Sequence, residues 1–188
     1  MGDIIKISST STVSAGETLV LDTNVLLWTY YSKIPPYSAY QTQVYPTFVS
    51  NAIQQGNPIV ITAFCLNEML HVIEKTELDL YNRSYGISGG IGLKKFRKIP
   101  TERSKVRSEI DLILRQIKAI PNLRIVKSKA TRKTIDSFMY DYHSHLADFF
   151  DFCLISFCNS QGFSVVSDDI DFANPYCKVR LYSANPKV

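Results

Sequence analysis

Five short apolar runs, separated by segments with helical spacing, constrain the fold of this chain most strongly. They are residues 18–22 (TLVLD), 59–62 (IVIT), 123–126 (LRIV), 163–167 (FSVVS) and 179–182 (VRLY). Unbroken apolar runs of this length are typical of strands buried on both faces, as in a parallel sheet. Strands that alternate with helices therefore predict an α/β fold with a mainly parallel sheet of about five strands.

Helical spacing of apolar residues fills the segments between these runs. We predict helices at residues 23–32, 46–55, 63–75, 103–119, 130–145 and 148–160. Thr23 is expected to cap the first helix, Pro35 and Pro36 to stop it, Pro46 to lie in the first turn of the second, and Gly162 to end the last. Residues 80–100 hold four glycines and are expected to form turns or a mobile loop.

The length of 188 residues suits one domain, residues 1–188, with a substantial core. No run has the length of a membrane span or of a signal-peptide core, so we expect a soluble cytoplasmic protein without a membrane partner. The four cysteines lack zinc-site spacing and are expected to be buried thiols. His143 and His145 are poorly placed for zinc because they point to opposite sides of a helix.

Positive charge is concentrated in residues 94–133. This segment holds 14 of the 21 Lys and Arg residues and only three acids, so its net charge is +11 and that of the remaining chain is −7. Two interpretations stay open, a polyanion-binding surface next to an acidic centre or a solvated helix face. On the first, nucleic acid would contact Lys94, Lys95, Arg97, Lys98, Arg103 and Lys105.

Carboxylates follow three of the predicted strands. Asp22 ends the first, Glu68 follows the second, and Asp168 and Asp169 end the fourth, while Asp148 and Asp151 begin the helix before it. Ligands bind outside the carboxyl ends of parallel strands, so these acids should converge. Converging carboxylates repel one another unless a cation neutralises them, and Mg²⁺ or Mn²⁺ prefers oxygen ligands. Two such ions about 3.5–4 Å apart can hold the attacking and leaving oxygens of a phosphodiester.

Three blocks carry these acids in order: LVLDTNVLLW (19–28), ITAFCLNEMLHVI (61–73) and DFCLISFCNSQGFSVVSDDIDF (151–172). They resemble the PIN domains, and the VapC-type toxin ribonucleases are the nearest branch. The resemblance implies a three-layer α/β/α fold with strand order 3-2-1-4-5. It also implies two-metal hydrolysis of RNA that leaves 5′-phosphate and 3′-hydroxyl ends. Compared with compact toxins, the chain adds an N-terminal arm (1–17) and a longer basic, glycine-containing insertion (76–122).

The resemblance and the placement together assign roles to individual side chains. Asp22, Glu68, Asp151 and Asp169 are the expected catalytic residues and ligands of Mg²⁺ or Mn²⁺, with Asp169 acting directly or through water. The residues expected to support them by hydrogen bonds are Asn24, Asp148, Ser167 and Asp168. Asp148 could equally be a helix-start charge. Asp171 is a further candidate, although a surface turn acid is its simpler interpretation.

The implied partners are RNA, single-stranded or structured, an antitoxin protein and a second copy of the chain. The alternative is a non-catalytic module with the same fold, in which the basic segment binds RNA or the tyrosine-rich stretch 30–45 forms a protein interface. Acids at all four expected positions favour catalysis over binding alone.

Overall fold

A parallel sheet forms the centre of the fold. The computed structural model describes residues 2–34, 38–86, 89–127, 130–141 and 147–188, so Pro35, Pro36, His143 and His145 lie outside the described ranges. Its strands are β1 (Ile4–Lys6), β2 (Leu19–Leu21), β3 (Ile59–Thr62), β4 (Leu123–Val126), β5 (Ser164–Val166) and β6 (Leu181–Ser183). Their order is β1-β6-β5-β2-β3-β4, and all neighbours are parallel. The five predicted strands and their 3-2-1-4-5 order are confirmed.

The N-terminal arm contributes a strand that the sequence did not predict. Ile4 pairs with Leu181 and Lys6 with Ser183, so β1 extends the sheet beyond β6. The Ser/Thr-rich composition of residues 1–17 conceals this short apolar run. The arm is therefore part of the sheet.

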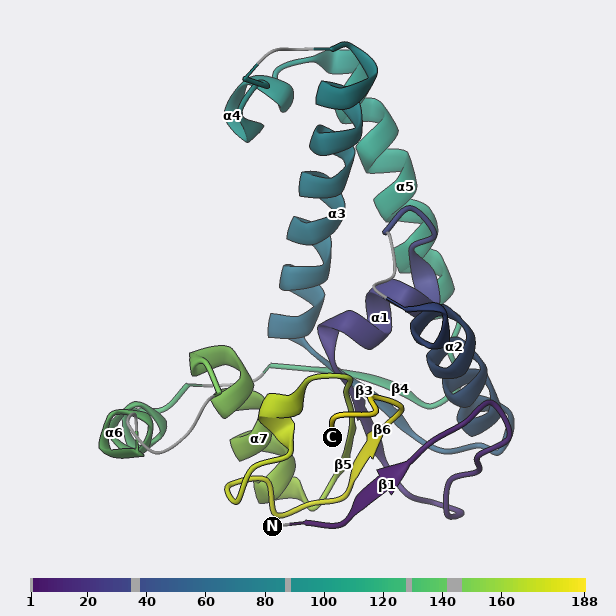
Figure 1. The fold of residues 1–188 in the computed structure, drawn as a ribbon, viewed down its shortest axis with the longest axis vertical. Helices are drawn as coiled ribbons and strands as arrows, with labels where there is room; N and C mark the ends of the chain where they lie inside the picture. The colour runs from purple at the N-terminus through teal and green to yellow at the C-terminus, as the bar shows by residue number, and fades with distance from the viewer. Residues whose placement is uncertain (1, 35–37, 87–88, 128–129, 142–146) are drawn as a thin grey trace.

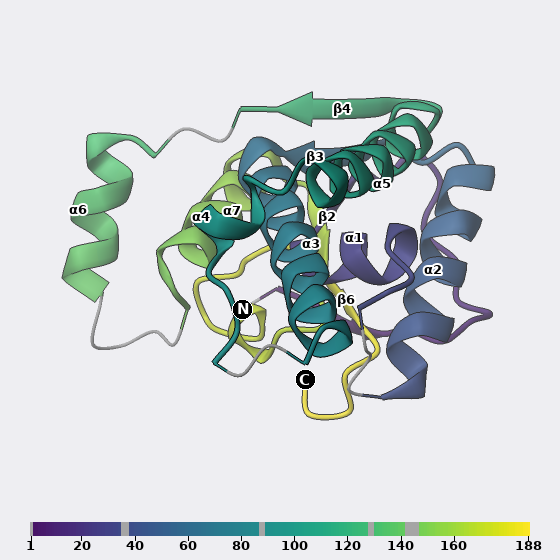
Figure 2. The same ribbon diagram turned by 90° about the horizontal axis from the view of Figure 1, so that it is seen from above.

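Helices cover both faces of the sheet. They are α1 (Thr23–Tyr30), α2 (Ala39–Gln54), α3 (Ala63–Ser84), α4 (Leu93–Phe96), α5 (Pro100–Lys118), α6 (Arg132–Asp141) and α7 (Phe149–Gln161), with a short 3-10 turn η1 (Ile170–Phe172). Figure 2 shows α2 and α7 on opposite sides of the strands, which gives three layers. The central strands β2, β3 and β5 are buried throughout, as their unbroken apolar runs predict.

The second helix differs from its prediction. It begins at Ala39, where the Gln41 side chain accepts the Ser38 backbone N–H at 3.1 Å, so Pro46 lies inside α2. An interior proline costs roughly 3 kcal/mol because a helical hydrogen bond is lost. Full burial of Tyr45, Phe48 and Val49 on one face offsets this cost.

The segment 76–122 is largely helical. In Figure 1, α3 and α5 rise side by side away from the sheet, and α4 lies at their far end. A second small core of Leu78, Phe96 and Val106 holds this end together. The turns expected from residue 80 onward therefore begin later, because α3 continues to Ser84.

Two further expectations concern the interior and the membrane. All four cysteines are buried and free, as predicted. Within the described ranges, no helix combines the length and apolar character that a membrane crossing requires.

Candidate functional site

The register of β2 and β5 brings Asp22 next to the end of β5. Leu21 of β2 pairs with Val166 of β5, so the next residues, Asp22 and Ser167, leave the sheet side by side. The Ser167 hydroxyl donates to Asp22 Oδ2 at 2.8 Å and accepts the Asp169 backbone N–H at 3.0 Å. Ser167 thus links the two acids that end these strands.

Asp22 lies in a buried, electrostatically unfavourable position. Its carboxylate accepts the Thr23 backbone N–H at 2.6 Å, so Asp22 caps α1 and the prediction of Thr23 as the cap is wrong. The pKa of Asp22 is raised to about 7, first by burial and then by the charges of Glu68 and Asp169, while the hydrogen bonds from Ser167 and Thr23 act in the opposite direction. A cation beside Asp22 would remove this penalty.

Three other carboxylates converge next to Asp22. Oxygens of Asp151, Asp169 and Asp171 lie within 4.8 Å of one another, a spacing that could hold a metal ion. The pKa of Asp151 is raised to about 8. Burial is the largest cause, and the charges of Asp22, Asp148, Asp169 and Asp171 act in the same direction. Asp171 joins the group because Asp169 caps η1, and the Asp169 side chain accepts the Asp171 N–H at 2.9 Å. Asp171 is thus an acid of a surface turn, as its simpler interpretation has it, and this turn brings it within reach of Asp151 and Asp169.

Glu68 approaches the group from α3. Its Oε2 accepts the hydroxyl of Thr23 at 2.7 Å, and its charge acts on Asp22. Glu68 is exposed and is not among the three most closely spaced acids. The bridging role of Thr23 was missed, although a hydroxyl directly after a strand-end acid is a usable signal.

Asp148 occupies the start of α7. Its Oδ1 accepts the backbone N–H groups of Phe150 and Asp151, at 2.8 and 3.0 Å. This is the helix-start role that the sequence left open, and it fixes the first turn of α7, where Asp151 lies.

The side chain of Asp168 is bonded to α2. Its carboxylate accepts hydrogen bonds from Tyr45 at 2.7 Å, from Gln41 at 2.8 Å and from Tyr40 at 3.1 Å. All three donors belong to α2, so Asp168 joins the end of β5 to that helix. The expected support of the metal ligands by Asp168 is therefore corrected, because neighbouring residues of an extended chain face opposite sides.

The same contacts explain the tyrosine-rich stretch. Tyr31 and Tyr45 are 2% and 0% exposed, and Tyr40 is bonded to Asp168. Tyr37 lies outside the described residues. Packing of the interior accounts for these described tyrosines better than a protein interface does.

Solved structures of other proteins share this arrangement of strands and helices. The chain shares its fold with a solved bacterial structure. That structure is VapBC2 from Rickettsia felis bound to a DNA fragment from their promoter, with a TM-score of 0.50, 14% identity, and coverage of 88% of this chain and 98% of the other. PAE2754 from Pyrobaculum aerophilum aligns with a TM-score of 0.45 and 11% identity over 91% and 88% of the two chains. No protein-family profile and no curated protein sequence matches. The VapBC2 likeness supports the α/β fold.

The predicted nucleic-acid contacts lie at the far end of the α3–α5 pair, unlike the acids at the sheet edge (Figure 1). Phe96 of α4 packs against Leu78, ten residues beyond Glu68 on α3. At 1.5 Å per residue this is roughly 15 Å. The helix α4 therefore lies away from the acids, although the Arg97 side chain reaches back to Glu74, six residues beyond Glu68 on α3.

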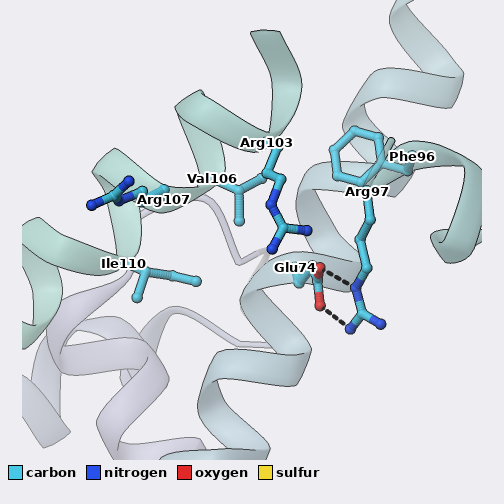
Figure 3. Close-up of a pocket in the computed structure, with 7 residues that line it drawn as sticks. All are labelled: Glu74, Phe96, Arg97, Arg103, Val106, Arg107 and Ile110. Atoms are coloured by element: carbon cyan, nitrogen blue, oxygen red, sulfur yellow. Dashed lines mark hydrogen bonds and ion pairs between the residues drawn. The ribbon is translucent and has the colours of Figure 1, made fainter. Parts of the chain in front are cut away.

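The six residues differ in their surroundings. Arg97, Glu74 and Arg103 line a cleft of about 530 Å³. Figure 3 shows the ion pair between Arg97 and Glu74. Arg97 Nε and Nη2 lie 2.6 and 2.5 Å from the Glu74 oxygens. Lys105 is paired with Glu102. The other three, Lys94, Lys95 and Lys98, are exposed, and no ion pair engages them within the described part of the chain.

Removal of one acid is expected to stabilise the metal-free protein at high pH. Folding raises the pKa of Asp151 from 3.8 to about 8, so between these values the folded state binds more protons than the unfolded state, and stability falls as pH rises. Asp151→Asn abolishes this loss. In EDTA its melting temperature should equal that of the wild type near pH 4 and exceed it by at least about 3 °C at pH 8.5. A difference that does not grow with pH contradicts this origin.

Proposed function

We propose that this chain is a metal-dependent endoribonuclease that acts in the cytoplasm. The observation that carries the proposal is the acidic group of Asp151, Asp169 and Asp171 beside the buried Asp22. These side chains lie outside the carboxyl ends of β2 and β5, where ligands bind in sheets of this kind. The fold shared with VapBC2 is consistent with a nuclease.

The donor set fits Mg²⁺ or Mn²⁺. All the converging ligand atoms are carboxylate oxygens, which hard divalent cations prefer. Burial and mutual repulsion raise the pKa values of Asp22 and Asp151. Asp151, Asp169 and Asp171 would hold the ion, with Asp22 beside them. When bound, such a cation stabilises the negative charge that develops on the phosphodiester.

The surrounding residues keep the acids in place. Ser167 bonds to Asp22 and to the backbone of Asp169, and Asp148 fixes the turn that carries Asp151. The Thr23 hydroxyl orients Glu68 by a hydrogen bond. We assign Glu68 as a fifth acid of the site, positioned by this hydrogen bond.

The test is an assay of the purified chain with labelled RNA and labelled single-stranded DNA, in Mn²⁺ and in EDTA. We expect cleavage of RNA only with Mn²⁺, with 5′-phosphate and 3′-hydroxyl ends. Cleavage in EDTA would sink the metal-dependent mechanism. RNA binding without cleavage would favour the non-catalytic module, and preferential cleavage of DNA would correct the substrate.

The exposed lysines of α4 are proposed to bind RNA phosphates. Each of Lys94→Gln and Lys95→Gln should reduce the slope of log affinity against log salt by about 1, because one fewer counterion is released. Lys178→Gln is the control, since Lys178 lies near Gly162 at the opposite end of α7 from the acids. Binding by labelled-RNA anisotropy at several salt concentrations provides the measurement. Equal slopes for all variants would exclude these lysines.

We extend the proposal to a toxin role, with an antitoxin protein as partner and a homodimer as the assembly. Its support is the similar fold in a complex named VapBC2. A small DNA-binding protein encoded next to this chain should co-purify with it and inhibit cleavage. Sedimentation should give twice the chain mass of 21.3 kDa. An adjacent protein that neither binds nor inhibits would argue against the toxin role.

A further inference from the structure

A hollow of about 280 Å³ adjoins the acidic group. Its lining includes Asn24 and Trp28 from α1, Asp169 and Ile170 from the start of η1, and Lys187 near the C-terminus. Asp169 belongs both to this hollow and to the group of three acids. A strand whose phosphodiester lies at the acids would therefore place a neighbouring nucleotide here.

Trp28 is a supported aromatic platform. It lies four residues after Asn24, which places both on one face of α1. Its ring stacks on Tyr45 with 5.4 Å between the ring centroids and 27° between the planes. Tyr45 is fully buried and donates to Asp168 at 2.7 Å. The indole is thus held in one orientation before a ligand arrives.

The other lining groups offer complementary chemistry. Asn24 is exposed, and within the described residues nothing pairs with its amide, so it can donate to and accept from a base edge. Lys187 is exposed, with no ion pair in the same part of the chain, and can contact a phosphate. Ile170 is 47% exposed and supplies an apolar wall. Single-stranded nucleic acid is recognised by this combination of stacking, hydrogen bonding and charge.

We propose that this hollow binds one unpaired nucleobase of the RNA strand next to the bond that is cut. The inference rests on the proposed ribonuclease function and names its substrate class as single-stranded RNA. A base in a duplex is stacked on its neighbours and paired, so it must be splayed out before it can stack on Trp28. Loops and unpaired segments of RNA should bind in preference to helices.

Trp28 is the sole tryptophan, so its fluorescence reports on this hollow. The wild-type chain in EDTA is titrated with unlabelled single-stranded RNA octamers, with free N-acetyltryptophanamide as the absorption control. Emission should be quenched to saturation, at the same RNA concentrations that change the anisotropy of a labelled octamer. A duplex of the same sequence should quench far less. Binding by anisotropy without quenching, no saturable binding, or equal quenching by the duplex would each overturn the proposal.

Substitution tests the platform directly. Trp28→Leu should weaken single-strand binding by roughly 5- to 150-fold, whereas Trp28→Phe should recover most of the affinity because a ring remains. Lys187 lies outside the stacked pair. Lys187→Gln should lower the slope of log affinity against log salt concentration by about 1. Melting temperatures of the variants identify any loss of folding. Wild-type affinity in both Trp28→Leu and Lys187→Gln would exclude the hollow.

These outcomes are separable from failure of the proposed function. Saturable quenching without any cleavage in Mn²⁺ would support the nucleobase site and contradict the proposed ribonuclease function. Mn²⁺-dependent cleavage that Trp28→Leu leaves unchanged, in rate and in affinity, would keep the ribonuclease and reject the nucleobase site.

Discussion

The double variant Asp22→Asn, Asp151→Asn is expected to lose at least about 100-fold of Mn²⁺-dependent RNA cleavage. Loss of groups that merely orient metal ligands typically costs 10–100-fold, and these two side chains belong to the acidic site itself. Asparagine keeps the shape of each side chain. At position 22 its oxygen can still accept the Thr23 N–H, so the cap of α1 survives. Initial cleavage rates on labelled RNA, measured at saturating Mn²⁺, give the comparison.

The matched control is Asp79→Asn, which removes one negative charge from an exposed position on α3. Its cleavage rate should stay within about twofold of the wild type, because surface charges away from a site act weakly through salt. Thermal melting should show both proteins folded. A double variant that retains wild-type activity would remove Asp22 and Asp151 from the mechanism.

Truncation of Asp168 is expected to reduce stability much more than truncation of Asp169. Asp168→Ala should lower the free energy of unfolding by about 3 kcal/mol, because Tyr45, Gln41 and Tyr40 lose a shared acceptor. Asp169→Ala loses a single turn-capping bond and relieves repulsion, so its stability in EDTA should change by less than about 1 kcal/mol. Urea unfolding of both variants measures the difference.

Cleavage activity should depend on Asp169 even though stability does not. Asp169→Ala removes a carboxylate of the acidic group and should abolish cleavage while the chain stays folded. Equal destabilisation by the two substitutions would contradict the assignment of Asp168 to the contacts with α2.

The sheet and the main acids follow from local sequence. Apolar runs at β2, β3 and β5 identify buried strands, and parallel strands share one carboxyl edge. The sequence alone therefore predicts that Asp22 and Asp169 lie at the same edge of the sheet. Asp151 followed from its place at the start of the helix before β5.

Other features depend on contacts that no local pattern encodes. Asp168 and Asp169 are adjacent acids, and only the position of α2 decides which one is bonded inside the protein. Asp171 enters the site through the turn of η1. Burial of Tyr45 and Phe48 keeps α2 continuous through Pro46, against the local preference.

The sequence shows where positive charge is concentrated along the chain but not how far it lies from the acids. Charge segregation in residues 94–133 is visible in the sequence, but its place relative to the acids depends on the length of α3. Because α3 runs from Ala63 to Ser84, it carries α4 away from the sheet edge. The role of these residues in binding nucleic acid stays a prediction.

Calorimetric titration of the metal-free chain with Mn²⁺, without nucleic acid, tests most directly whether the converging acids form a cation site. The wild type should bind Mn²⁺ saturably and release protons at pH 7, because Asp22 and Asp151 are partly protonated without a cation. Asp151→Asn should bind at least about tenfold more weakly, and Asp79→Asn should match the wild type. Equal affinity in all three proteins, or no saturable binding by the wild type, would contradict the account.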